Sequence, residues 1–86
     1  MRYEVTTRLT PQEALDRASA HFGPQGEGLE ITGRDEHGIV FQGGGGYVAV
    51  TAQPGERTVL ELATNEWDRA VQEFMSQVHW VSILRG

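Results

Sequence analysis

Four consecutive glycines, Gly43 to Gly46, are the residues whose type and spacing most suggest chemistry. Successive backbone N–H groups can form a concave anion site, as in phosphate-binding loops. A P-loop, however, ends in Lys-Ser or Lys-Thr and leads into a helix. Here Tyr47 and an apolar segment follow, and the chain contains no lysine. The pattern therefore favours a flexible hairpin or a bent strand, with a ligand-contacting loop as the alternative.

The histidines and acids do not form a metal-binding motif in the sequence. His21, His37 and His79 lie far apart, and no His-x-x-x-His or Glu-x-x-His pair occurs. A metal site would have to be assembled from separate acids such as Asp35 and Glu36, which are more typical of a solvated turn. We therefore expect no metal site and no cofactor.

Catalytic groups are also scarce. The chain has no cysteine, and none of its serines lies in a Gly-x-Ser-x-Gly elbow. Glu27 with Glu30, or Glu56 with Glu61, could form paired carboxylates, but any small acidic protein offers such pairs. We expect no catalytic residue; an enzyme would need a pocket with strongly perturbed acids.

Composition limits the partners further. The 86 residues carry a formal charge of −5, and the seven basic residues are arginines dispersed along the chain. Nucleic-acid binding, which depends on clustered positive charge, is not expected. Without cysteine there are no disulfides and no thiolate metal sites. No apolar stretch reaches the ~20 residues of a membrane span, and the start lacks a signal-peptide core, so we expect a cytoplasmic protein and no membrane contact.

The elements that would position these residues follow from periodicity. Alternation at period two predicts a first strand from Arg2 to Leu9, and Thr10-Pro11 with Glu13 predicts a capped helix to His21 or Phe22. A second strand should place Leu29 and Ile31 on one face and Glu30 and Thr32 on the other. Further strands are expected at residues 39–42, 47–53 and 58–63, with polar turns between them.

The clearest amphipathic pattern is near the end of the chain. With Asn65 as N-cap, a helix is predicted over roughly Glu66 to Ser82. Its apolar stripe consists of Trp67, Ala70, Val71, Phe74, Val78 and Val81. Trp80 points about 140° from that stripe at about 100° per residue, near Ile83 and Leu84. This outer surface indicates an interface, unless the helix ends early and the tail buries Trp80.

The element order is therefore β-α-β-β-β-β-α in a single α+β domain, residues 1–86. Short turns join the four middle strands, which predicts an antiparallel meander within a five-stranded antiparallel sheet. Two helices across one face of the sheet would close the core, giving two layers.

This element order resembles one repeat of the TATA-box-binding-protein-like fold and, more loosely, a small helix-grip domain. The resemblance implies an architecture and a dimer, because two such repeats form the saddle of that family. It does not imply DNA binding, since outward positions include Glu30 and Glu61 rather than a basic surface. No family motif assigns a site residue.

The sequence thus predicts a small non-catalytic interaction module that forms a homodimer. Its interface would be a sheet edge or the surface of Trp80, Ile83 and Leu84. The alternative is a small-molecule binding domain with a pocket between the sheet and the last helix. The residues expected to line that pocket are Phe41, Gly43, Gly44, Gly45, Gly46, Tyr47 and Trp67.

Overall fold

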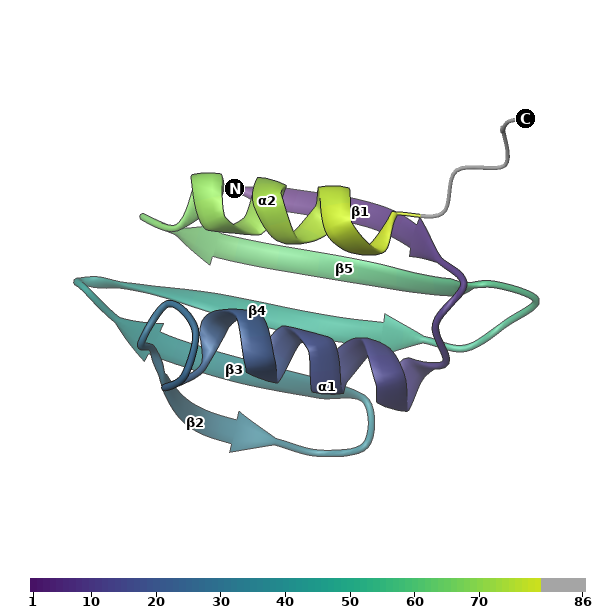
Figure 1. Ribbon diagram of the computed structural model, residues 1–86, viewed down its shortest axis with the longest axis horizontal. Coiled ribbons are helices and arrows are strands. Elements are labelled where there is room, and N and C mark those ends of the chain that lie inside the picture. Colours follow the sequence, from purple (N-terminus) through teal and green to yellow (C-terminus); the bar gives the residue numbers. More distant parts are fainter. Residues whose placement is uncertain (80–86) are drawn as a thin grey trace.

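The computed structural model describes residues 1–79, whose elements follow the predicted order β-α-β-β-β-β-α (Figure 1). The strands are β1 (Arg2–Thr7), β2 (Glu30–Arg34), β3 (Gly38–Gly43), β4 (Gly46–Gln53) and β5 (Thr58–Asn65). The helices are α1 (Pro11–Phe22) and α2 (Asp68–Val78). The predicted α+β class is confirmed.

The five strands form one antiparallel sheet in the order β1-β5-β4-β3-β2. Strands β2 to β5 are the expected meander, because each short turn returns the chain beside the strand it has just left. Helix α1 then carries the chain from one side of the sheet to the other, so that β1 and β2 are the two edge strands.

Both helices pack on the same face of the sheet, α1 over β3 and β4 and α2 over β5 and β1 (Figure 1). Alternate strand residues point into the core between the layers. Its largest side chains are Phe22, Phe41 and Phe74, and the Phe22 ring lies 5.4 Å from that of Phe41 and 5.2 Å from that of Phe74. No helix in residues 1–79 is long and apolar enough to cross a membrane.

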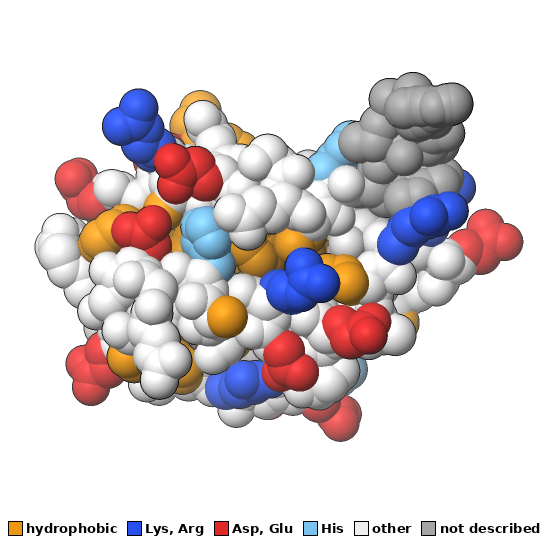
Figure 2. All heavy atoms as spheres, viewed as in Figure 1, with side chains coloured by type: hydrophobic (Ala, Val, Ile, Leu, Met, Phe, Trp, Pro, Cys, Tyr) orange, Lys and Arg blue, Asp and Glu red, His pale blue; other side chains and the backbone are white. Residues whose placement is uncertain are grey.

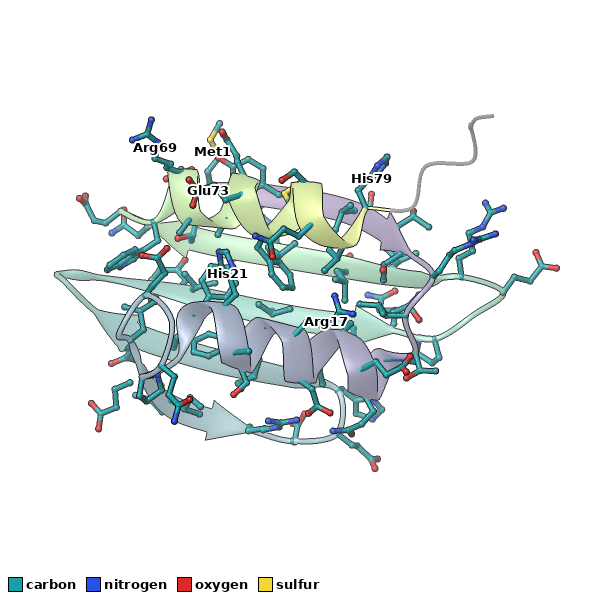
Figure 3. All side chains as sticks on the ribbon, in the orientation of Figure 1. Met1, Arg17, His21, Arg69, Glu73 and His79 are labelled. Atoms are coloured by element: carbon teal, nitrogen blue, oxygen red, sulfur yellow. The ribbon has the colours of Figure 1, made fainter. Side chains whose placement is uncertain are left out.

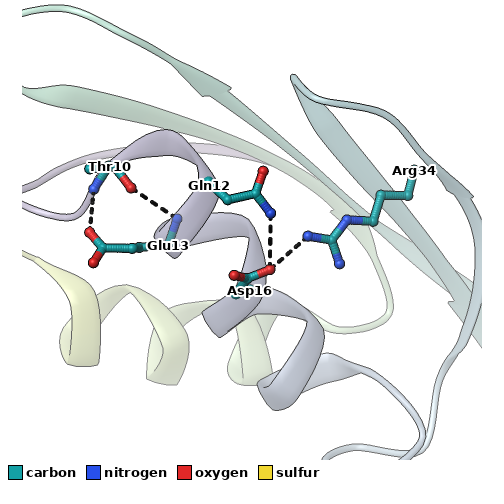
Figure 4. Close-up of polar contacts among 5 residues, drawn as sticks. All are labelled: Thr10, Gln12, Glu13, Asp16 and Arg34. Atoms are coloured by element: carbon teal, nitrogen blue, oxygen red, sulfur yellow. Dashed lines mark hydrogen bonds and ion pairs between the residues drawn. The ribbon is translucent and has the colours of Figure 1, made fainter.

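The start of α1 confirms the predicted capping box (Figure 4). The Thr10 hydroxyl accepts a hydrogen bond from the Glu13 backbone N–H at 3.1 Å, and the Glu13 carboxylate accepts one from the Thr10 N–H at 2.9 Å. One turn later Asp16 accepts a 2.7 Å charged hydrogen bond from Arg34, which fastens strand β2 to the helix.

The predicted helix at residues 66–82 was wrong at both ends. Asn65 is not its N-cap but the last residue of β5, paired with Tyr47. Glu66 then takes a φ of 78°, and Trp67 stands at the N-cap with no side-chain hydrogen bond. The helix ends at Val78, because His79 adopts extended backbone and bridges Thr7 of β1. Trp80, Ile83 and Leu84 lie outside the described residues.

Ile31 pairs with the buried Phe41, so its side chain lies on the helix-bearing face together with Leu29, as predicted. Leu29 is buried but precedes β2, whereas Ile31 is exposed. All five residues of β2 are exposed at this edge of the sheet, since α1 lies over β3 and β4. The β2–β3 register also shifts between Ile31 and Gly33. Strand β1, predicted to reach Leu9, ends at Thr7, whose hydroxyl accepts a hydrogen bond from the Leu9 N–H.

The β2–β3 turn carries a prediction about acid stability. The backbone N–H groups of His37 and Gly38 donate to the Asp35 carboxylate at 2.8 and 2.9 Å, and these bonds lower the pKa of Asp35. A carboxyl whose pKa is lower in the folded state adds stability above its unfolded pKa of about 3.9 and loses it as pH falls through the folded value. Denaturant unfolding at pH 6 and pH 3 should therefore show a smaller acid-induced loss of stability in Asp35→Asn. Equal losses in both proteins would contradict this.

Candidate functional site

The glycine run forms the β3–β4 hairpin. Gly43 and Gly46 are its closing pair, and the two residues between them have φ values of +58° and +82°. Positive φ at both central positions is what a type I′ turn requires, and this turn matches the twist of the strands. The predicted hairpin is thus present, and its geometry alone accounts for two of the glycines.

Trp67 packs against this hairpin from the start of α2. Its indole N–H donates to the Gly43 carbonyl at 2.9 Å, and a Cβ at Gly44 would lie 2.7 Å from the ring. The structure therefore joins Trp67 to the glycine run. It separates the other two predicted pocket residues, since Phe41 is fully buried in the core and Tyr47 points to the opposite, uncovered face of the sheet.

The space beside Trp67 is small. A hollow of about 140 Å³ is lined by Trp67, Ala70, Glu27, Glu73 and neighbouring residues. Sites for drug-sized ligands occupy roughly 300–1,000 Å³. A small-molecule pocket here stays a prediction. A wider hollow of about 390 Å³ lies elsewhere, between the β2–β3 turn and β4.

The structure also assembles a cluster of metal-binding side chains that the sequence did not predict. His21 ends α1, Glu27 follows in the loop to β2, and Glu73 comes from α2. Their ligand atoms all lie within 4.8 Å of one another. Figure 3 shows His21 and Glu73 converging from the two helices, and in Figure 2 a histidine lies between the helices with acidic side chains beside it.

The loop after α1 brings Glu27 back to the helix end. The Glu27 N–H donates to the His21 carbonyl at 2.9 Å, and the Gly28 N–H donates to the Gly23 carbonyl at the same distance. A Cβ at Gly26 would lie 2.1 Å from the His21 carbonyl oxygen, so only glycine allows the chain to pass this close. The cluster thus depends on a tight reversal of the backbone.

A second site candidate is the outer edge of β1 from Arg2 to Val5; farther along the strand, Thr7 forms an antiparallel bridge with His79 on this edge. Met1 and Thr64 exchange both backbone hydrogen bonds, at 2.6 and 2.8 Å. Bonded and non-bonded pairs alternate along an antiparallel ladder. The backbone N–H and C=O groups of Tyr3 and Val5 therefore also point toward β5, whereas those of Arg2 and Glu4 point outward, away from the sheet.

The edge is held in place by a polar contact with α2. The Tyr3 hydroxyl donates to the Asp68 carboxylate at 2.5 Å, and this hydrogen bond raises the pKa of Tyr3. Because the phenol is anchored on the helix-bearing face, the backbone of β1 is fixed before any partner binds. Such preorganisation reduces the entropy cost of association.

The opposite edge is less suited to pairing. Strand β2 has only five residues, contains the register shift after Ile31, and has its Arg34 side chain bound to Asp16. Short, charged and bulged edge strands are how proteins prevent unwanted strand pairing. Of the two edges, β1 is the more regular from Arg2 to Val5.

Comparison with protein-family models and with curated proteins finds no match for this chain. The sites above therefore rest on their own geometry.

Proposed function

We propose that this chain is an interaction module that forms a homodimer by antiparallel pairing of β1 with the β1 of a second copy. The observation that carries the proposal is the regular, anchored edge from Arg2 to Val5, which precedes the Thr7–His79 bridge and has outward backbone groups at Arg2 and Glu4. Two copies would form a continuous ten-stranded sheet with the helices on one side.

The charges on β1 favour one register. With the two-fold axis at Tyr3, Arg2 of each copy lies opposite Glu4 of the other, and these two residues exchange the new backbone hydrogen bonds. Moving the axis to Glu4 would place the two Glu4 carboxylates opposite each other, which is destabilising. The strand is thus self-complementary in one arrangement.

An exposed methionine supports the same arrangement. Met1 is 77% exposed, the highest value among the large apolar side chains that are exposed in residues 1–79. In the Tyr3-centred register it lies opposite Val5 of the second copy, on the helix-bearing face. Dimerisation would therefore remove apolar surface from water as well as pair the strands.

Charge exchange tests the proposal. Sedimentation should show a concentration-dependent dimer with a dissociation constant in the micromolar range, as expected for a small interface. Arg2→Glu and Glu4→Arg should each weaken the dimer by about tenfold, because each places like charges opposite one another twice. The double variant R2E/E4R should recover the affinity.

Recovery of the dimer affinity in R2E/E4R would show that the single variants weaken the interface and do not simply misfold. Arg2 also lies 3.7 Å from Glu61 of its own chain, so thermal unfolding of each variant should be measured alongside sedimentation. A protein that stays monomeric at high micromolar concentration would overturn the proposal. So would a dimer that neither single variant weakens.

A further inference from the structure

We propose that His21, Glu27 and Glu73 bind a divalent transition-metal ion, with Zn²⁺ the ion that best fits these ligands. The three residues come from α1, the following loop and α2, and their ligand atoms lie within 4.8 Å of one another. An ion bound there would join the two helices and the loop on the outer side of the helix layer.

A hydrogen bond from one ring nitrogen of His21 leaves the other nitrogen available to an ion. The Nε2 of His21 lies 3.2 Å from the Ala70 carbonyl oxygen, and a carbonyl only accepts, so Nε2 carries the proton in this contact. Nδ1 then keeps its lone pair for an ion. Histidine ligands usually donate their second ring N–H to a carbonyl or carboxylate in this way.

Aromatic contacts fix the same ring. The His21 ring packs edge-on against Phe22 at 4.9 Å and at a tilt against Phe74 at 5.5 Å. Phe74 is the neighbour of Glu73 in α2, so the packing that holds the imidazole also fixes the backbone that carries one carboxylate. The nitrogen ligand and one oxygen ligand are therefore positioned by the core.

The two carboxylates converge without a basic partner. Among residues 1–79, neither Glu27 nor Glu73 forms an ion pair within 4.0 Å. Arg69 borders the same hollow, but its side chain points away from His21 (Figure 3). Two negative groups beside an imidazole leave a local excess of negative charge, which a divalent cation would neutralise.

The chemical types of the three ligand atoms indicate which ion would bind. One imidazole nitrogen and two carboxylate oxygens suit Zn²⁺, whereas Mg²⁺ and Ca²⁺ prefer oxygen ligands alone. Ligand atoms on a tetrahedral Zn²⁺ bound at about 2.1 Å are about 3.4 Å apart. The exposed side chains of Glu27 and Glu73 would close to that spacing by rotation, with water completing the coordination.

Calorimetric titration of the full chain with ZnCl₂ tests this site. We expect one Zn²⁺ per chain with micromolar affinity and no detectable binding of Mg²⁺ at the same concentrations. Glu27→Gln and Glu73→Gln keep the side-chain shape, and each should weaken Zn²⁺ binding by at least about tenfold. At Zn²⁺ concentrations of about 100 times the dissociation constant, the Tm of the unchanged protein should rise by roughly 10 °C.

Controls distinguish this site from adventitious surface binding. Glu56→Gln, an exposed acid in the β4–β5 turn, should bind Zn²⁺ like the unchanged protein. His37 lies 3.5 Å from Glu36 and is an alternative His/Glu pair on the surface. If Zn²⁺ binds at the proposed site and not at this pair, His37→Asn should also leave the affinity for Zn²⁺ unchanged. In NMR spectra the His21 ring signals should shift on Zn²⁺ addition. No binding at about 1 mM Zn²⁺, or an affinity in both glutamine variants equal to that of the unchanged protein, would overturn the proposal.

Discussion

Replacing Gly46 with alanine is expected to lower the free energy of unfolding by about 3 kcal/mol or more. A Cβ at this position would lie 2.0 Å from the Asn65 carbonyl oxygen and 2.7 Å from the Glu66 Cβ. Neither neighbour can move easily, because Asn65 is paired with Tyr47 in the β4–β5 ladder and Glu66 forms the turn into α2. The added methyl group would separate two central strands where the hairpin closes.

The glycine run supplies its own matched control. Gly45 has a φ of +82°, and nothing lies within 4 Å of a Cβ built on it. Asparagine tolerates this backbone region, so Gly45→Asn should cost no more than about 1 kcal/mol. Urea unfolding of both variants provides the comparison. Similar losses for Gly46→Ala and Gly45→Asn would mean that backbone conformation, not close packing against Asn65, governs the hairpin.

Phe74→Ala should have the other large effect, a loss of about 3–5 kcal/mol. Phe74 is 1% exposed, and its ring contacts Phe22 at 5.2 Å and His21 at 5.5 Å, so truncation would leave a cavity between α1 and α2. A domain of this size has only about 4–13 kcal/mol of stability in total. The variant should therefore be partly unfolded at room temperature or melt far below the unchanged protein.

Two further substitutions in α2 calibrate that loss. Phe74→Leu keeps most of the buried volume and should cost less than half as much as Phe74→Ala. Gln77→Ala, on the exposed side of the same helix, should change the free energy of unfolding by no more than about 0.5 kcal/mol. If Phe74→Ala and Gln77→Ala unfold at the same urea concentration, the aromatic contacts between the helices do not stabilise the fold.

The dimer and the metal site are independent of each other in structure and in test. The proposed dimer uses the outer edge of β1, and the proposed Zn²⁺ site uses the groove between α1 and α2. Charge exchange at Arg2 and Glu4 leaves His21, Glu27 and Glu73 intact. Failure of one proposal would leave the other standing.

Much of the fold could be predicted because it depends on local patterns. Alternation at period two located the strands, and the capping box at Thr10 and Glu13 fixed the start of α1. The four-glycine run predicted a hairpin because two adjacent positive φ values are strained for nearly every other residue. These signals need only neighbouring residues to take effect.

The errors arose where a distant contact determined the local structure. Asn65 has the chemistry of an N-cap, yet it extends β5 because Tyr47 pairs with it across the sheet. The helix then starts after Trp67, whose indole N–H is bonded to Gly43.

The same contrast between local patterns and distant contacts applies to the candidate sites. The sequence by itself determined the element order, the sheet with its helical cover, the hairpin at Gly43 to Gly46 and the absence of any thiol or lysine chemistry. Only the tertiary structure brought His21, Glu27 and Glu73 together and placed β1 at an edge of the sheet. The physical reason is that periodicity reflects which side of an element is buried, whereas convergence of side chains from separate elements depends on how those elements pack.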